Sequence, residues 1–210
     1  MILFKIFLSA FLIDNVILMR FLALCPFIGM SSDEDKAVGM GLAVTFVTVL
    51  ATCVTFPIYR IILAHRYEFS LFGYDFSLDL KFLKLLVFIL VIASLVQLVE
   101  FYLKKSAPAL YGSMGIYLAL ITTNCAILAV TLEVQDNICP FTGREYRFEE
   151  ALVYALGVAL GFLLSLLLLA GIRRRIKTSP IPPFLKGTPV LFVAAALLSV
   201  AFMGFKGLVK

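Results

Sequence analysis

Six apolar stretches, each long enough to cross a lipid bilayer, follow one another along this chain of 210 residues. A membrane-spanning helix needs about 20 mostly apolar residues. The hydrophobic share of 62% therefore leaves room for six such helices and no separate soluble domain. The stretches cover approximately residues 2–28, 39–63, 82–103, 110–132, 149–172 and 189–208. The sequence predicts an all-α integral membrane protein that forms a single membrane domain, residues 1–210.

The order of these stretches predicts a repeat. Three spans lie in each half of the chain, and an odd number per half inserts the two halves into the membrane in opposite directions. We therefore expect two inverted three-helix repeats, at about residues 1–105 and 106–210. In both halves the first span, spans one and four of the whole chain, is expected to contain an interrupted helix.

The interruption in the fourth span is marked by polar residues that precede a thiol. Thr122, Thr123 and Asn124 stand in an apolar run directly before Cys125. Thr and Asn are poor residues inside a helix but good residues at its start, because their side-chain oxygens accept hydrogen bonds from free backbone N–H groups. The pattern predicts that a helix begins again at Cys125, part-way through the membrane.

The first span contains a similar thiol. Cys25 lies in an apolar run and is followed by Pro26, which removes a backbone donor and fits only the first turn of a helix. We expect Pro26 to interrupt the helix directly behind Cys25. The two cysteines occupy comparable places in the two halves. The remaining cysteines are interpreted differently: Cys53 as a packed small residue, and Cys139 as a loop residue outside any site.

Ionisable and amide side chains inside apolar spans are candidates for function. The first span carries Asp14, Asn15 and Arg20, too many polar groups for a helix that faces lipid. Glu100 lies near the end of the third span, where it can also reach Lys104 at the interface. Asp14, Asn15 and Glu100 are therefore candidate residues of an ion path.

The net charge of +5 is ordinary for a multi-pass membrane protein and gives no evidence for nucleic-acid binding. The densest basic cluster is Arg173 to Lys177. Because cytoplasmic loops carry an excess of Lys and Arg, we place this cluster in the cytoplasm. Both termini are then expected on the outer, periplasmic side of the cytoplasmic membrane.

Three interpretations of Cys25 and Cys125 remain open from the residues alone. The thiols are inert core residues, or they form a disulfide, or they ligate a metal centre. Two thiolates are too few for tetrahedral iron or zinc, so the third interpretation requires a partner subunit that supplies two more. An oxidised [2Fe–2S] centre with four thiolates carries about two negative charges, which the N-termini of the interrupted helices would compensate. Pro26, Thr123 and Asn124 mark these helix breaks and are candidate cofactor-binding residues.

Several stretches resemble the family of membrane subunits that includes RnfA of the Rnf ferredoxin:NAD⁺ oxidoreductase and NqrE of the sodium-pumping quinone reductase. They are spread over nearly the whole chain, and the fourth and fifth are the most specific. The matching stretches are Leu24-Cys25-Pro26-Phe27, Gly39-Met40-Gly41-Leu42-Ala43, Val96-Gln97-Leu98-Val99-Glu100, Leu120-Ile121-Thr122-Thr123-Asn124-Cys125-Ala126 and Ala201-Phe202-Met203-Gly204-Phe205.

The resemblance implies a subunit of a translocase without a catalytic site of its own. It implies that Cys25 and Cys125 are two of four ligands of an intramembrane [2Fe–2S] cluster, shared with an RnfE-like subunit of opposite topology. Electrons would cross the membrane through this cluster, coupled to Na⁺ or H⁺ transport. The resemblance also implies further partners, which are Rnf subunits of the B, C, D and G type. Flavins are expected only in those other subunits. The alternatives are a secondary transporter for a small cation or solute, and a purely structural assembly subunit.

Overall fold

The computed structural model describes residues 2–32, 34–60, 81–106, 120–136, 139, 143–180, 182 and 187–205. Every regular element in these ranges is a helix. The end of the second predicted span and residues 110–119 of the fourth lie outside the described residues. The elements are α1 (Ile2–Leu8), the π-helix η1 (Ser9–Ile13), α2 (Val16–Arg20), α3 (Leu24–Met30), α4 (Glu34–Ile58), α5 (Lys81–Ser106), α7 (Cys125–Asp136), α8 (Phe148–Lys177) and α9 (Thr188–Met203).

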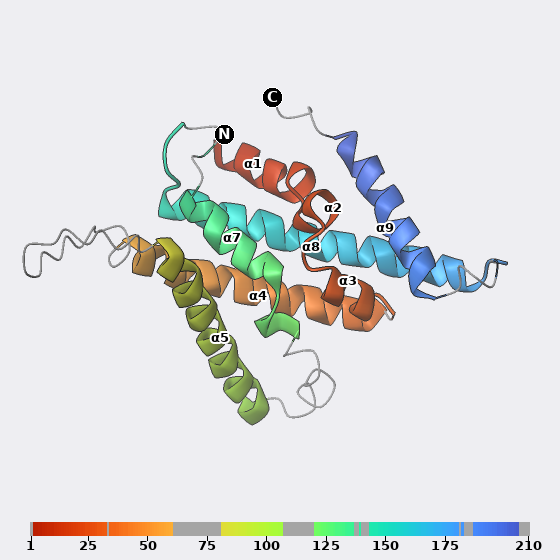
Figure 1. Ribbon diagram of the computed structural model, residues 1–210, viewed down its shortest axis with the longest axis horizontal. Coiled ribbons are helices and arrows are strands. Elements are labelled where there is room, and N and C mark those ends of the chain that lie inside the picture. Colours follow the sequence, from red (N-terminus) through yellow and green to blue (C-terminus); the bar gives the residue numbers. More distant parts are fainter. Residues whose placement is uncertain are drawn as a thin grey trace, which may run out of the picture.

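Two long helices, α4 and α8, lie side by side across the molecule (Figure 1). They are antiparallel, because Glu34 at the start of α4 pairs with Arg174 near the end of α8. At the other end, the rings of Phe56 and Phe148 meet edge to face with centroids 5.7 Å apart. These two helices are long and apolar enough to cross a membrane, with mean hydropathies of 2.1 and 2.6.

Four shorter apolar stretches accompany this pair: Ile2–Ile13, Leu85–Phe101, Leu120–Gln135 and Thr188–Met203. Both the first and the fourth predicted spans are interrupted, as the sequence predicts. The first span, however, is interrupted twice, at Asp14–Asn15 and again at residues 21–23, whereas the sequence predicts one interruption. The count of six spans and the inverted repeat stay predictions.

Backbone that leaves a helix inside a membrane needs partners for its free N–H and C=O groups. At the first interruption, the side chain of Asn15 supplies the acceptor for two freed N–H groups. Its Oδ1 accepts from the backbone N–H groups of Ile17 at 3.1 Å and Leu18 at 3.3 Å. Its Nδ2 donates to the carbonyl of Gly161 at 2.9 Å and to Ser165 Oγ at 2.8 Å. Asn15 is completely buried, so its side chain joins the interrupted span to α8.

Small residues of α8 let the interrupted span approach closely. A Cβ atom added to Gly157 would lie 2.8 Å from the Cβ of Ala10 and 3.0 Å from the carbonyl oxygen of Phe7. A Cβ atom added to Gly161 would lie 2.7 Å from the carbonyl oxygen of Phe11. Glycines four positions apart share one helix face and allow this kind of backbone contact between membrane helices.

We expect Gly161→Ala to destabilise the protein by about 1–3 kcal/mol, because the added methyl group meets backbone that cannot move aside easily. Gly171→Ala in the same helix is the matched control, since nothing lies within 4 Å of its added Cβ. There, alanine should stabilise the helix by about 0.5–1 kcal/mol. Thermal unfolding of the purified variants in detergent measures both changes in stability. A lower unfolding midpoint for Gly171→Ala than for Gly161→Ala would contradict this packing of α8 against the first span.

Candidate metal centre

The helix restart predicted at Cys125 is confirmed. The preceding helical turn ends at Thr122, and Cys125 is the first residue of α7. Asn124 caps the new helix, because its Oδ1 accepts from the backbone N–H of Ala126 at 3.0 Å. The Asn124 side chain is buried, and its Nδ2 has no hydrogen-bond partner among the described residues. Thr123 lies exposed in the turn between the two helices.

The interruption near Cys25 lies upstream of the position predicted from Pro26. Helix α3 begins at Leu24, so Cys25 and Pro26 both belong to its first turn. A proline there loses no hydrogen bond, since first-turn N–H groups have no partner within their helix. The chain instead turns at Phe21 and Ala23, which have positive φ angles of 53° and 60°. Non-glycine residues rarely adopt this conformation, so the surrounding contacts hold it in place.

One contact brings the two breaks together. The backbone N–H of Ala23 donates to the Sγ of Cys125 at 2.9 Å. Because two residues span at most about 7 Å, the backbone of Cys25 lies close to this contact. From here α3 and α7 run toward opposite ends of the molecule (Figure 1). Both Cys25 and Cys125 are free thiols with exposed side chains, so the disulfide interpretation finds no support in the structure.

The thiols of Cys25 and Cys125, beside this contact, could supply half of the ligands of a metal site. Cysteine thiolates bind iron in iron–sulfur clusters, which take four such ligands. Among the described residues, no group of three or more His, Cys, Asp and Glu side chains lies close enough to hold a metal. Cys25 and Cys125 are both exposed, and a backbone N–H is directed at the sulfur of Cys125; together they match half of the ligand set of such a cluster.

The other two cysteines lie elsewhere. Cys53 is half-buried in α4. Cys139 is fully buried; its N–H donates to the carbonyl of Arg144 and its own carbonyl accepts from Gly143, both at 2.9 Å. These two hydrogen bonds join Cys139 to the segment that precedes α8. Burial raises the pKa of the neighbouring Tyr146 hydroxyl, which therefore stays neutral at physiological pH.

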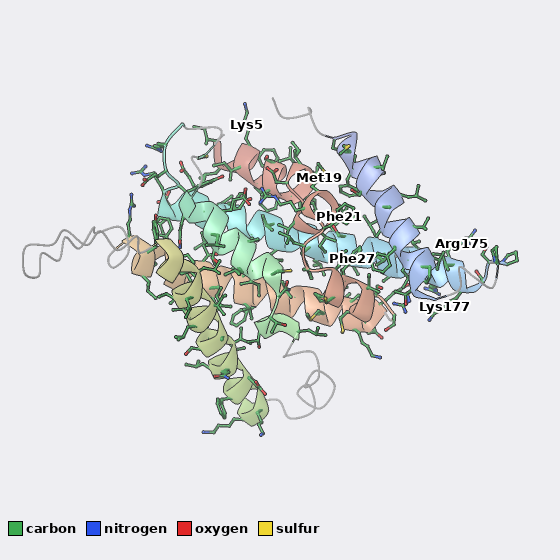
Figure 2. The ribbon with its side chains drawn as sticks, in the orientation of Figure 1. Lys5, Met19, Phe21, Phe27, Arg175 and Lys177 are labelled. Carbon is green, nitrogen blue, oxygen red and sulfur yellow. The ribbon has the colours of Figure 1, made fainter. Side chains whose placement is uncertain are left out.

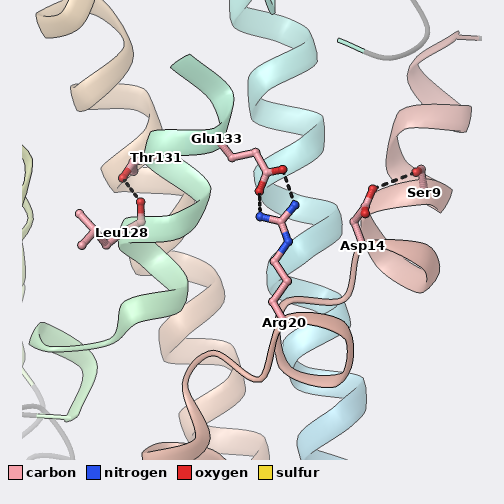
Figure 3. Close-up of polar contacts among 6 residues, drawn as sticks. All are labelled: Ser9, Asp14, Arg20, Leu128, Thr131 and Glu133. Atoms are coloured by element: carbon pink, nitrogen blue, oxygen red, sulfur yellow. Dashed lines mark hydrogen bonds and ion pairs between the residues drawn. The ribbon is translucent and has the colours of Figure 1, made fainter. Parts of the chain in front are cut away.

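Two of the candidate ion-path residues, Asp14 and Asn15, lie together at the first interruption, whereas Glu100 lies on another helix. Asp14 ends η1 and accepts from Ser9 Oγ at 3.4 Å (Figure 3). Asn15 is engaged in the four hydrogen bonds that hold the first interruption. Glu100 lies half-buried on α5, outside both helix breaks.

An ion pair between Arg20 and Glu133 was not predicted from the sequence. Both terminal nitrogens of the Arg20 guanidinium donate to the two carboxylate oxygens of Glu133 (Figure 3). Arg20 ends α2 and Glu133 lies on α7, so the pair joins the two interrupted spans. Glu133 stands one residue beyond the expected end of the fourth span at Leu132, where an acid is easily taken for a loop residue.

Comparison with known proteins identifies the family. The family described as "Rnf-Nqr subunit, membrane protein" matches residues 3–209. The chain belongs to the Rnf-Nqr family. It is therefore a membrane protein, as its hydrophobic pattern predicts.

Relatives in the Rnf-Nqr family match over nearly their full lengths. The chain is 45% identical over 203 residues to the A-type subunit of the Na⁺-translocating ferredoxin:NAD⁺ oxidoreductase complex of Acetobacterium woodii, covering 97% of this chain and 96% of the relative. It is 39% identical over 205 residues to the A-type subunit of the proton-translocating complex of Clostridium ljungdahlii, covering 98% and 96%. It is 45% identical over 205 residues to the A-type subunit of an ion-translocating oxidoreductase complex of Syntrophotalea carbinolica, covering 97% and 96%.

The cap of α7 in this Rnf-Nqr protein gives a direct test of the geometry at Cys125. We expect Asn124→Ala to cost about 0.5–2 kcal/mol, because the backbone N–H of Ala126 loses its acceptor. Asn124→Ser restores a neutral capping oxygen and should recover most of this loss. Thermal unfolding in detergent compares the two. Equal losses in both variants would mean that the cap contributes nothing.

Proposed function

We propose that this Rnf-Nqr chain carries electrons through the membrane as the A-type subunit of an ion-translocating ferredoxin:NAD⁺ oxidoreductase. Its relatives of similar length are named as the corresponding subunits of such complexes. The observation that carries the proposal is the hydrogen bond from Ala23 to Cys125, which joins the two breaks beside two exposed thiols. In this proposal Cys25 and Cys125 are two of the four ligands of a [2Fe–2S] cluster. When bound, such a cluster accepts and passes on one electron at a time.

The remaining two thiolates come, in this proposal, from a homologous RnfE-like subunit of opposite topology. Exposure of both cysteines supports this arrangement, since a site completed within one chain would bury them. The antiparallel pairing of α4 and α8, the second spans of the two predicted repeats, supports the inverted repeat on which opposite topology depends.

The surroundings of Cys125 favour a negatively charged group. The N-terminus of α7 carries about half a positive charge from its aligned peptide dipoles, and Asn124 accepts from its N–H groups at Ala126 and Ile127. The N–H of Ala23 adds a donor to the sulfur itself. Hydrogen bonds to cluster sulfurs are one of the means by which a protein tunes a reduction potential. These donors would lower the energy of the added charge on reduction.

The proposal includes the orientation and partners of the chain. Glu34 at the start of α4 lies beside Arg174, so Lys36 and the basic end of α8 belong to the same end of the molecule. An excess of basic residues favours the cytoplasmic side. Both termini then face the outside of the cytoplasmic membrane. Further partners are Rnf subunits of the B, C, D and G type, and the flavins reside in those subunits.

The test is co-expression of this chain with its RnfE-like homologue, followed by purification of the pair. Each pair should contain two iron atoms and absorb visible light, and the absorption should bleach on reduction with dithionite. A colourless pair without iron would contradict the proposal, and sodium binding to such a pair would favour the transporter alternative.

A further inference from the structure

An open apolar groove lies between α8 and α9. Its volume is about 360 Å³. It is open on one side and lined almost wholly by aliphatic side chains. The lining residues that matter here are Ile172 and Ile176 of α8 and Val190, Ala194, Leu197 and Ala201 of α9.

The groove is long on the side of α9. Between Val190 and Ala201, α9 rises about 16 Å at 1.5 Å per residue, whereas α8 contributes only Ile172 and Ile176 to the lining. An apolar surface of this length can cover much of one extended hydrocarbon chain.

Two cations lie near one end of the groove, where Ile176 and Val190 belong to its lining. Arg175 and Lys177 lie at the end of α8, beside the start of α9 (Figure 2). Arg173 and Arg174 of the same turn are engaged, with the carbonyl of Ile28 and with Glu34. Within the described part of the chain, the side chains of Arg175 and Lys177 form no hydrogen bond or ion pair and are exposed.

We propose that the α8–α9 groove binds one acyl chain of an anionic phospholipid, whose phosphate group is held by Arg175 and Lys177. Basic residues at the membrane surface attract anionic lipid headgroups, and the apolar channel below them accepts the tail. This inference does not depend on the proposed electron-transfer function.

The experiment uses the full chain, purified together with its membrane partners and stripped of lipid by detergent exchange. Phosphatidylglycerol or phosphatidylcholine is then added, and native mass spectrometry counts the lipid molecules retained. We expect one molecule of phosphatidylglycerol to be retained and phosphatidylcholine to be lost. R175Q/K177Q should weaken phosphatidylglycerol retention about tenfold or more. K104Q/K105Q, which removes two exposed cations from the end of α5, is the matched control and should change nothing.

A second pair of variants tests the groove itself. Ala201→Phe places a ring in the channel from an exposed position and should abolish retention. Ala196→Phe changes an exposed residue of the same helix that does not line the groove, and should retain the lipid. Equal retention of both lipids, or equal retention by both phenylalanine variants, would overturn the proposal. A disulfide from Ala201→Cys to another polypeptide of the assembled complex would overturn it as well.

Discussion

Replacement of Cys25 or Cys125 by serine should remove the iron from the co-expressed pair of subunits completely. A serine hydroxyl is a poor ligand for iron, and a cluster with three of its four thiolates is not retained through purification in this proposal. Both single variants should have the same effect, since each sulfur supplies one of the four ligands. Iron quantification and visible absorption of the purified pair measure the loss.

Cys53→Ser is the matched control for these variants. Cys53 is half-buried within α4, far along the chain from both breaks, and its replacement should leave the iron content unchanged. A Cys25→Ser or Cys125→Ser pair that purifies intact and keeps its full iron content would refute the ligand assignment. If electron transfer also persists in those variants, the structural assembly role becomes the better interpretation.

Glu133→Ala should destabilise the chain by about 2 kcal/mol or more. The variant leaves the guanidinium of Arg20 without the two acceptors that it now has. Hydrogen bonds to charged groups contribute about 1.5–3 kcal/mol, and removal of one partner leaves the other charge uncompensated. The Glu133 side chain is 14% exposed and that of Arg20 is 39% exposed, so water replaces the lost partner only in part. The thermal unfolding midpoint in detergent should fall clearly.

A second Arg–Glu pair of the same chain supplies the control. Arg174 and Glu34 also join two helices, but their side chains are 80% and 55% exposed. Exposed pairs contribute between about 0 and 1 kcal/mol, so Glu34→Ala should hardly move the midpoint. The double variant Arg20→Met/Glu133→Met removes both charges and should be more stable than Glu133→Ala. An unfolding midpoint for Glu133→Ala equal to that for Glu34→Ala would show that the Arg20–Glu133 pair does not hold α2 and α7 together.

The helix restart at Cys125 was predictable because its signal is local. Thr122, Thr123 and Asn124 precede it, and the capping bond runs from Asn124 to a residue two positions away. The apolar character of α4 and α8 was predictable for the same reason. In both cases the information lies within one stretch of sequence.

The other interruptions depend also on residues that are distant in sequence. Asn15 caps α2 locally through the N–H groups of Ile17 and Leu18, but its Nδ2 donates to Gly161 and Ser165, which lie 146 and 150 positions away. Phe21 and Ala23 turn the chain without a glycine, and the partner of the Ala23 N–H lies 102 positions away. Pro26 signalled a break at the correct end of the span but a few residues too late, since a proline marks the first turn of a helix and not where the previous helix ends.

The Arg20–Glu133 pair shows the same limit for charged residues. Arg20 in an apolar span signals that a partner exists, but its sequence position does not say which acid that is. Glu133 lies 113 positions away and follows an apolar run as an ordinary boundary residue would. The pairing of Arg20 with Glu133 becomes clear only in the folded structure, where α2 and α7 lie next to each other.

The exposure of Cys25 and Cys125 has a consequence for how cells make this protein. In the proposed assembly, a copy that inserts into the membrane before its counterpart arrives presents two exposed thiols that the finished assembly covers. Those thiols distinguish orphan copies chemically from assembled ones. A membrane-permeant maleimide applied to living cells would therefore label Cys25 and Cys125 only in the orphan copies, and the labelling of these two positions would report how closely synthesis of the two polypeptides is matched.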